Sequence, residues 1–283
     1  MPSRKAPTVR QRRLGAEMRK MRERTGLSLT EAGAMLSTDR TTVSNIESGR
    51  FGVSTERVRT WAEHYGCSDE AYIDALAEMA RERISGWWED YRGELTSDAL
   101  DLAELEHHAA GLRSIEIMHI PGLLQTEDYA RAVFAEAVPP LSPTHQRRLL
   151  SHRLKRRDVL DRVDQPRCVF LIHEAALRMV YGGSAIARSQ LDYLLLQSER
   201  DNVVIRAIPF AAGGFPHANS SAQYLYGPVP QLDTAQTDTA TGSGFLDAET
   251  SLENWRVALN RTEERSLDPE KTRDFIRTIA LQV

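Results

Sequence analysis

Two domains of different fold class are predicted for this 283-residue chain. Up to about residue 85 the apolar residues recur at the spacing of helices, which predicts an all-α domain of five helices. From residue 86 onward short β-branched runs alternate with helical segments, which is typical of an α/β (or α+β) domain with a small sheet flanked by helices. The length agrees, because one domain commonly holds about 100–200 residues. We therefore expect a multidomain chain with domains at 1–85 and 86–283.

The first domain opens with a helix predicted over residues 9–24. Leu14, Met18 and Met21 lie on one stripe of this helix among charged residues, and Gly26 follows as a stop signal. The stripe gives the helix one face to bury and leaves the opposite face to solvent.

Two short helices joined by a turn are predicted next. Ser28 lies three residues before Glu31, which is the spacing of a capping box at a helix start. Asp39 is a suitable N-cap for the second of these helices, which we expect over residues 39–48. Two helices connected in this way form a helix-turn-helix, whose second helix fits the major groove of DNA.

Two further helices, over residues 54–65 and 68–82, complete the five. The apolar residues of the second short helix, Val43 and Ile46, are expected to face the core that these helices form. We place the domain boundary at residues 82–86. No Gly/Ser-rich or Pro-rich stretch occurs there, so we expect a stiff connection.

The second domain is predicted to be mixed. Helices are expected over residues 96–110, 126–137, 142–163, 185–199, 250–265 and 268–281, with Thr126, Ser142 and Asp268 as N-caps. Strands are expected over residues 167–173, 202–209 and 222–226. The stretch 227–244 is rich in Pro, Thr, Asp and Gly and leaves two alternatives open, a weak strand or a long loop.

The charge of the chain is unevenly distributed. Residues 1–66 hold 13 Lys/Arg and 7 Asp/Glu and are therefore at +6, whereas the remainder holds 23 and 33 and is at −10. Nine of the basic residues lie within the first 24 positions, where they form a basic arm. Lys and Arg side chains neutralise the phosphates of a nucleic acid, so we expect DNA contacts from the N-terminal segment alone.

Several classes of protein are excluded by composition. Cys67 and Cys168 are too few and too far apart for a disulfide scaffold or a zinc site, so we expect reduced thiols, no metal and no cofactor. No run of 18 apolar residues and no signal peptide are found. We therefore expect a cytoplasmic protein with no membrane partner.

The first domain resembles a known family. The shared residues are Gly26-Leu27-Ser28, Ala32-Gly33, Leu36 and Val43-Ser44-Asn45-Ile46-Glu47-Ser48-Gly49-Arg50. Over about residues 10–70 they resemble the helix-turn-helix of the Cro/phage-repressor family, also called the xenobiotic-response-element family. The resemblance implies contacts to double-stranded DNA. Base edges would be contacted by Arg40, Thr41, Thr42 and Asn45, and phosphates by Ser44 and Arg50.

Two residues depart from that family's pattern. Leu29 stands where a Gln often begins the first helix of the motif and supports the DNA contact, so the set of phosphate contacts is expected to differ. Ser37 stands where the turn commonly has Gly, so we expect Ser37 to adopt a less usual backbone angle.

The rest of the chain resembles an actinobacterial regulator family. Its markers are Gly86-Trp87-Trp88-Glu89-Asp90-Tyr91, Ile120-Pro121-Gly122-Leu123-Leu124-Gln125-Thr126-Glu127-Asp128-Tyr129-Ala130-Arg131, Glu174-Ala175-Ala176-Leu177-Arg178 and Ile208-Pro209-Phe210-Ala211-Ala212-Gly213. In that family a Cro-type domain precedes a domain of about 180–190 residues whose molecular role is not settled. The resemblance implies a developmental or antitoxin-like regulator paired with a small companion protein.

Catalytic signals are weak. Glu104 and His108 lie four apart on one helix face but supply only two metal ligands, and His173-Glu174 has no matching nucleophile nearby. Gly242-x-Gly244 lacks the third glycine of a dinucleotide fingerprint. The basic run with Arg147, Arg148, Arg153, Lys155, Arg156 and Arg157 is interpreted as a solvated helix face, with an acidic partner or the DNA backbone as the alternative. We name no catalytic residue.

The predicted function is that of a sequence-specific DNA-binding transcriptional regulator, most simply a homodimer. Its second domain would serve dimerisation, partner binding or the sensing of a small-molecule effector, for which the loop 211–216 after a strand is a candidate border. Two alternatives remain. The second domain could be an enzyme acting on a nucleotide or small metabolite, with the helix-turn-helix as a targeting module, or the first domain could be an adaptor that does not bind DNA.

Overall fold

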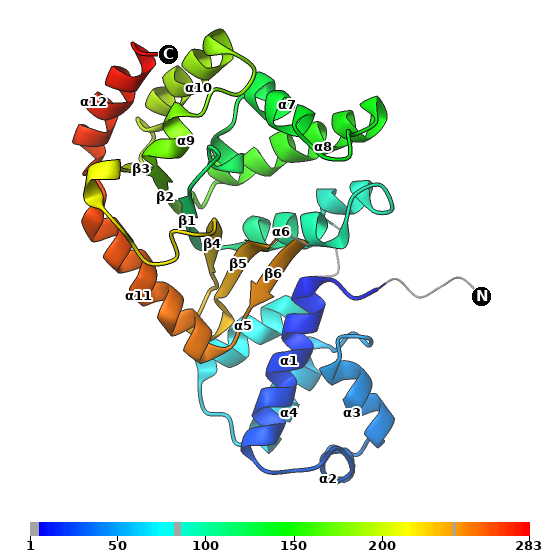
Figure 1. Ribbon diagram of the computed structural model, residues 1–283. Coiled ribbons are helices and arrows are strands. Elements are labelled where there is room, and N and C mark those ends of the chain that lie inside the picture. The colour runs from blue at the N-terminus through cyan, green and yellow to red at the C-terminus, as the bar shows by residue number, and fades with distance from the viewer. Residues whose placement is uncertain (1–5, 82–85, 240–241) are drawn as a thin grey trace. The chain divides into compact units, whose positions relative to one another are not determined.

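The computed structural model describes residues 6–81, 86–239 and 242–283. The chain divides into two compact units, Met1–Glu89 and Asp90–Val283 (Figure 1). The boundary predicted at 82–86 and the expected end of the last helix at residue 82 fall largely on residues 82–85, which lie outside the described residues.

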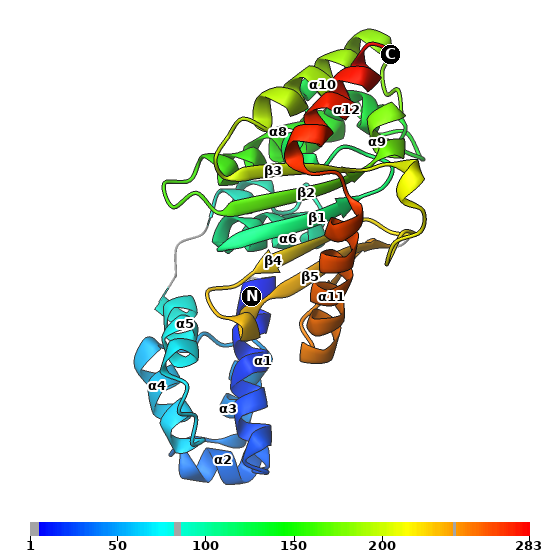
Figure 2. The same ribbon diagram turned by 90° about the vertical axis from the view of Figure 1, so that its left-hand side faces the viewer.

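The first unit contains five α-helices in its described part, as predicted. They are α1 Val9–Arg24, α2 Leu29–Met35, α3 Arg40–Glu47, α4 Thr55–His64 and α5 Glu70–Arg81 (Figure 2). The 3-10 helix η1 Trp87–Tyr91 follows. Met18, Val43, Ile46, Trp61 and Leu76 are buried, so the apolar stripes meet in one core. The expectation that Val43 and Ile46 face this core is confirmed.

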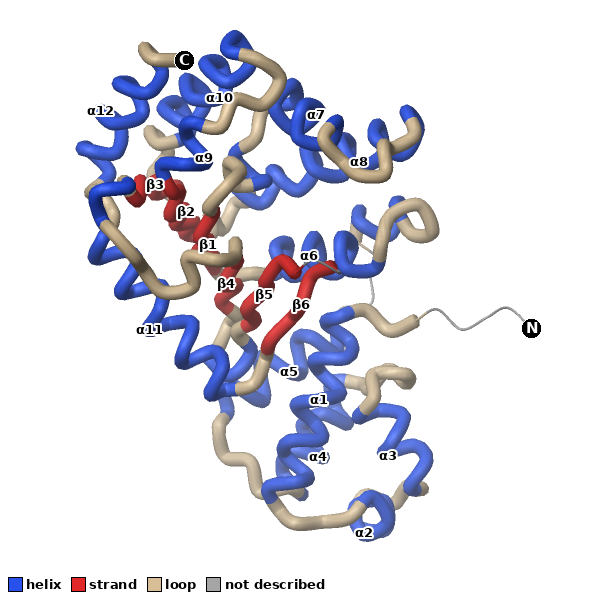
Figure 3. Tube along the Cα trace, in the orientation of Figure 1, coloured by secondary structure: helices blue, strands red, loops and turns tan. Residues whose placement is uncertain are grey.

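A six-stranded mixed sheet forms the centre of the second unit (Figure 3). The strands are β1 Gly111–Glu116, β2 Arg167–His173, β3 Val203–Ile208, β4 Ala222–Tyr226, β5 Thr234–Thr239 and β6 Gly242–Leu246. Their order is β3-β2-β1-β4-β5-β6, with β1, β2 and β3 parallel and the β1–β4, β4–β5 and β5–β6 pairs antiparallel. The predicted fold class, helices followed by a domain with a sheet and helices, is confirmed.

The sheet is larger than the sequence predicts. Strand β1 at 111–116 was not predicted. Of the two alternatives for the stretch 227–244, the strand is the one found, although the stretch contains β5 and also the beginning of β6. Both additions carry many polar residues, which do not show the apolar alternation of a half-buried strand.

Helices surround this sheet. The α-helices are α6 Ser97–His108, α7 Glu127–Ala135, α8 Pro143–Arg156, α9 Glu174–Arg178, α10 Ser184–Gln197, α11 Glu249–Arg265 and α12 Pro269–Ala280, and the 3-10 helices are η2 Gly122–Leu124, η3 Arg157–Asp161, η4 Phe210–Ala212 and η5 Pro230–Leu232. Side chains of Thr126, Ser142 and Asp268 cap α7, α8 and α12 as expected. The helix predicted over 142–163 is wrong in its last part, since the α-helix ends at Arg156 and tightens into η3.

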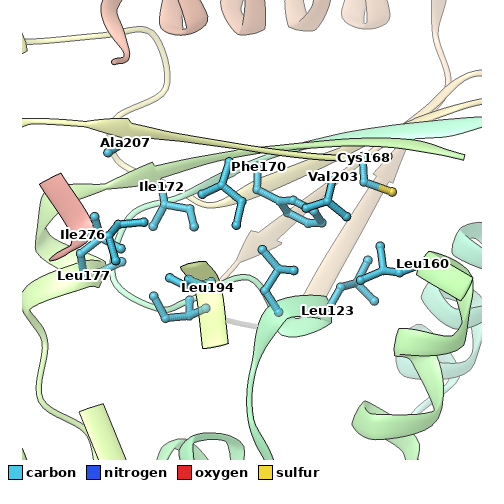
Figure 4. Close-up of a cluster of buried hydrophobic side chains, with 14 of the residues drawn as sticks. Leu123, Leu160, Cys168, Phe170, Ile172, Leu177, Leu194, Val203, Ala207 and Ile276 are labelled. Atoms are coloured by element: carbon cyan, nitrogen blue, oxygen red, sulfur yellow. The ribbon is translucent and has the colours of Figure 1, made fainter. Parts of the chain in front are cut away.

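The sheet separates two hydrophobic cores. On one face Cys168, Phe170 and Ile172 of β2 pack with residues of η2, α10 and α12 such as Leu123 and Leu194 (Figure 4). On the other face the alternate β2 residues Val169 and Leu171 pack against Leu252, Trp255 and Leu259 of α11. Because successive side chains of a strand point to opposite faces, β2 is buried on both sides.

Candidate nucleic-acid interface

Local hydrogen bonds fix both ends of the helix-turn-helix, which consists of α2, the turn and α3. The hydroxyl of Ser28 accepts a hydrogen bond from the Glu31 N–H at 3.3 Å, and the Glu31 carboxylate accepts one from the Ser28 N–H at 2.8 Å. The Asp39 carboxylate accepts from the N–H of Thr42 at 2.9 Å and from its hydroxyl at 2.6 Å. These hydrogen bonds hold the Asp39 pKa below its usual value. The capping predictions for Ser28, Glu31 and Asp39 are therefore confirmed.

The turn between α2 and α3 is tight. Ser37 has φ +52°, so the less usual backbone angle expected there is confirmed. The Thr38 N–H donates to the Gly33 carbonyl at 2.8 Å, and a Cβ on Gly33 would lie 3.0 Å from the Thr38 carbonyl oxygen. Gly33 thus allows α2 to approach the turn closely.

Two glycines bring α1 close to the C-terminal end of α3. A Cβ on Gly15 of α1 would lie 2.6 Å from the Ile46 carbonyl oxygen and 2.7 Å from that of Glu47. Gly49 has φ +71°, and a Cβ there would lie 2.9 Å from the Gln11 carbonyl oxygen. Side chains at either position would push the two helices apart.

A buried ion pair joins the same two helices. Arg22 of α1 donates from Nε and Nη2 to the two carboxylate oxygens of Glu47 on α3, at 2.6 and 2.8 Å. Its Nη1 donates to the Leu27 carbonyl at 2.7 Å. The side chains are only 9% and 5% exposed, and the hydrogen bonds to Glu47 raise the Arg22 pKa above its ordinary value. Arg22 stays charged, and its fork fixes where α3 lies on α1.

Glu17 forms a second buried junction within this unit. The Tyr72 hydroxyl of α5 donates to Glu17 of α1 at 2.5 Å, and the Lys20 ammonium donates to the other carboxylate oxygen at 2.7 Å. Burial and the hydrogen bond to Glu17 raise the Tyr72 pKa, so this phenol remains a donor. The junction links α1 to α5.

The predicted DNA-contacting residues lie on or next to α3. Arg40, Thr41, Ser44 and Arg50 are exposed, whereas Thr42 and Asn45 are half-buried. The side chain of Thr42 is bonded to the cap residue Asp39. Within the described part of the chain, no hydrogen bond or ion pair engages the side chains of the other five. Their polar groups are therefore available to a ligand.

The residues that position α3 were not predicted from the sequence. Arg22 was counted in the basic arm, but its charge is neutralised by Glu47 and it does not contribute to a DNA-facing surface. Glu47 follows the buried Ile46 and lies one turn after the buried Val43. A charged residue next to these two core positions was the one sign in the sequence that Glu47 is buried. The pairing partner, 25 residues away, has no local signature.

Two of the weak catalytic signals of the second unit, His173 and Glu174, have structural roles. His173 Nδ1 accepts from the Ala175 N–H at 3.2 Å and caps α9, while Glu174 accepts from the Phe210 N–H at 2.8 Å and from Arg178 at 2.7 Å. In the described residues no cluster of three His, Cys, Asp or Glu side chains is suited to a metal ion. Likewise, none of the helices described has the length and apolar content needed to cross a membrane.

The basic run of α8 is not uniformly solvated, which corrects the prediction. The side chain of Arg156 is 11% exposed and donates to both carboxylate oxygens of the buried Glu106, at 2.7 and 2.6 Å. Arg153 and Arg156 are half-buried and line a pocket. Arg147 is exposed, as predicted for a solvated face.

Comparison with known families agrees with this architecture. Residues 13–76 match the model of a helix-turn-helix domain, which supports DNA binding by a two-domain protein of helix-turn-helix class. Residues 99–278 match the family described as domain of unknown function (DUF5753). This second match covers more than half of the chain, and the chain belongs to that family. Comparisons with curated proteins and with solved structures gave no match.

The Arg22–Glu47 pair leads to the first prediction. Glu47→Gln leaves the buried guanidinium without its counter-charge, and we expect the free energy of unfolding to fall by about 3–5 kcal/mol. The matched control is Glu78→Gln, which breaks the exposed Arg81–Glu78 pair, whose side chains are 73% and 57% exposed, and should cost less than about 1 kcal/mol. Urea unfolding of the full chain, followed by circular dichroism, measures both. Equal losses would show that the buried pair does not hold α3.

Proposed function

We propose that the protein is a sequence-specific DNA-binding transcriptional regulator whose recognition helix is α3. The observation that carries the proposal is the set of exposed or half-buried polar side chains on and just after α3 that have no partner within the described part of the chain, namely Arg40, Thr41, Ser44, Asn45 and Arg50. The helix-turn-helix match over residues 13–76 supports it. The rigid attachment of α3 to α1 supports it further, because base recognition needs side chains held in register.

The chemistry of these side chains suits base edges and phosphates. Arg40 can donate two hydrogen bonds to guanine O6 and N7, and Asn45 can pair with adenine N6 and N7. Thr41 offers a hydroxyl or a methyl group to base edges, whereas the hydroxyl of Thr42 is used by Asp39. Ser44 and Arg50 are proposed to contact phosphates. The protein would then read about one turn of major groove with α3.

The regulator is proposed to act as a homodimer in the cytoplasm. One recognition helix contacts few base pairs, and helix-turn-helix proteins commonly multiply affinity and sequence content by binding two half-sites. The sequence resemblance to Cro-type domains and to an actinobacterial regulator family supports this assembly, and it also suggests an antitoxin-like role with a small companion protein. The second unit would supply dimerisation, partner binding or effector sensing.

We propose binding rather than catalysis for the second unit. The strongest catalytic candidates, His173 and Glu174, are engaged in capping α9 and in holding the Phe210 backbone. A buried carboxylate with two structural hydrogen bonds is poorly placed to serve as an acid or base. We therefore favour binding over the alternative of an enzyme delivered by a targeting module.

Charge reversal at Arg40 tests the proposal. Genomic fragments selected by the wild-type protein provide the binding site, and Arg40→Glu should weaken binding to that site at least about tenfold in mobility-shift titrations, because a carboxylate faces the base edge or phosphate that attracted the guanidinium. Arg81→Glu, with the same charge change on α5 outside the helix-turn-helix, should change affinity less than about threefold. Unchanged affinity of Arg40→Glu would refute the assignment of α3.

The dimer proposal makes a separate prediction. Genome-wide footprinting should reveal two inverted half-sites about 10–10.5 base pairs apart or at a multiple of that spacing, because two symmetric recognition helices enter successive major grooves on one DNA face. Light scattering of the isolated protein should give the mass of two chains of 31.8 kDa each. A single unrepeated half-site together with a monomeric mass would contradict the proposal.

A further inference from the structure

The second unit contains a polar pocket of about 460 Å³. It lies between the β1–β4–β5 part of the sheet and the elements α6, η2 and α8, which lie on the same side of that sheet (Figure 1). Its charged and polar lining includes Ser114, Glu116, His119, Arg153, Arg156 and Asp238. Pockets of about 300–1,000 Å³ commonly bind small molecules, so the volume is sufficient for a metabolite.

The floor of the pocket is a row of polar side chains on the sheet. Ser114 of β1 is paired with Gln223 of β4, and Gln223 is paired with Gln236 of β5. Glu116 and Asp238 lie two residues further along β1 and β5, and therefore on the same face. Ser114 is 3% exposed, and its hydroxyl has no hydrogen-bond partner in the described part of the protein. A buried hydroxyl without a partner is costly and indicates a group that a ligand would satisfy.

One of the two pocket arginines is already neutralised. Arg156 forms a two-pronged pair with Glu106, whose carboxylate also accepts from Gln223 Nε2 at 2.9 Å. Glu106 is 1% exposed, so this assembly is a fixed part of the wall. The charge of Arg156 is therefore balanced by Glu106 without a ligand.

The other arginine makes no ion pair in the described part of the chain. Arg153 Nη1 donates at 2.8 Å to the neutral Oε1 of Gln125, its guanidinium lies 4.7 Å from the centre of the Phe134 ring, and no carboxylate of the described residues pairs with it. A Cβ on Gly122 would lie 3.7 Å from the Nη1 atoms of both Arg153 and Arg156, so the two guanidinium groups converge there. Burial and the neighbouring Arg156 lower the Arg153 pKa to about 10 against the attraction of Glu116, Glu106 and Asp238, and Arg153 stays charged at neutral pH.

The Pro121-Gly122-Leu123-Leu124-Gln125 segment, which the sequence analysis singled out, orients this arginine. Gln125 Nε2 donates to the Ile120 carbonyl at 2.7 Å, which directs its Oε1 at Arg153. Gln190 of α10 holds the next residues, donating to the Leu124 carbonyl and accepting from the Thr126 N–H, both at 2.7 Å. Arg153 is therefore presented to the pocket by an ordered, buried hydrogen-bond network.

Carboxyl groups line the same pocket. Asp98, Glu116 and Asp238 make no ion pair in the described part of the chain. Asp238 accepts from Gln236 Nε2 at 2.7 Å and from the Ser243 hydroxyl at 3.3 Å, which fixes its position. Burial and also Asp238 raise the Glu116 pKa to about 7, although the hydrogen bond to Ser221 and the charges of Arg153 and Arg156 act to lower it. An ammonium group near this pair would relieve the repulsion between the two carboxylates.

We propose that the pocket binds a small zwitterionic molecule, with its acidic group at Arg153 and its ammonium group at Glu116 and Asp238. The acidic group is a carboxylate or a phosphate, both of which a guanidinium accepts. The Ser114 hydroxyl supplies a further hydrogen bond. The inference deepens the effector role within the proposed function, but the binding itself requires no DNA.

Thermal unfolding of the full chain tests the site with defined probes. The panel holds the twenty L-amino acids and O-phosphoethanolamine as zwitterions, and propionate, inorganic phosphate and propylamine as probes with only one charged group, each at about 10 mM. We expect at least one zwitterion to raise Tm by about 2 °C or more, with no comparable effect of the single-charge probes, because only a zwitterion satisfies both ends of the pocket. An amino acid as the active probe assigns a carboxylate at Arg153, and O-phosphoethanolamine assigns a phosphate.

Variants locate the binding by calorimetry with the active probe. Arg153→Met and Glu116→Gln should each weaken binding at least about tenfold, while Arg147→Met on the exposed part of the same helix should change it less than about twofold. Glu116→Gln keeps the side-chain shape and provides the test if Arg153→Met does not fold.

Three outcomes would overturn the inference: no shift across the panel, an equal shift with a single-charge probe, or undiminished binding by both pocket variants. Each is independent of the Arg40→Glu result. A failed pocket assay and a failed DNA assay therefore remain distinguishable.

Discussion

The position of α3 depends on the buried pair between Arg22 and Glu47. A guanidinium and a carboxylate joined by two parallel hydrogen bonds tolerate little sliding or rotation, which an apolar contact would allow. The backbone contact at Gly15 acts at the same crossing and sets the distance between α1 and α3. Together the two features convert a helix of eight residues, too short to be stable alone, into a rigid element. The exposed side chains of α3 are therefore carried by a helix whose position is fixed.

The first unit shows which features a sequence reveals. Caps such as Ser28–Glu31 and Asp39 are local, and their residue types and spacing were sufficient to predict them. The apolar stripe of α1 was predicted for the same reason, whereas the unusual angle of Ser37 was expected from the resemblance to a family that commonly has Gly at that place. The ion pair of Arg22 was not, because a cation that will be buried and one that will face phosphate look alike in sequence. Only the fold brings Glu47 to it, and a charge count therefore overstates the basic surface available to DNA.

In the second unit the strands that were hardest to predict, β1 and β5, supply charged residues to the pocket. Strand β2 is apolar along most of its length and was predicted. Strand β1 carries Ser114 and Glu116 on its pocket face, and β5 carries Gln236 and Asp238 there, so neither shows the apolar alternation on which strand prediction depends. Prediction of strands from apolar patterns fails where the residues line a binding site and do not pack in the hydrophobic core. The polar residues that made these strands difficult to predict are also the residues that line the proposed site.

The pocket also shows that the arginines of α8 have different roles. Arg156 and Glu106 neutralise each other, and removing either side chain would leave the other as a buried, unpaired charge. We therefore assign this pair a structural role. Arg153 differs because it is equally ordered, by Gln125 and Phe134, but makes no ion pair among the described residues. Only the longer-range attraction of carboxylates such as Glu116 and Asp238 offsets the cost of its desolvation. A zwitterion placed between Arg153 and these carboxylates would give each charged group a direct partner.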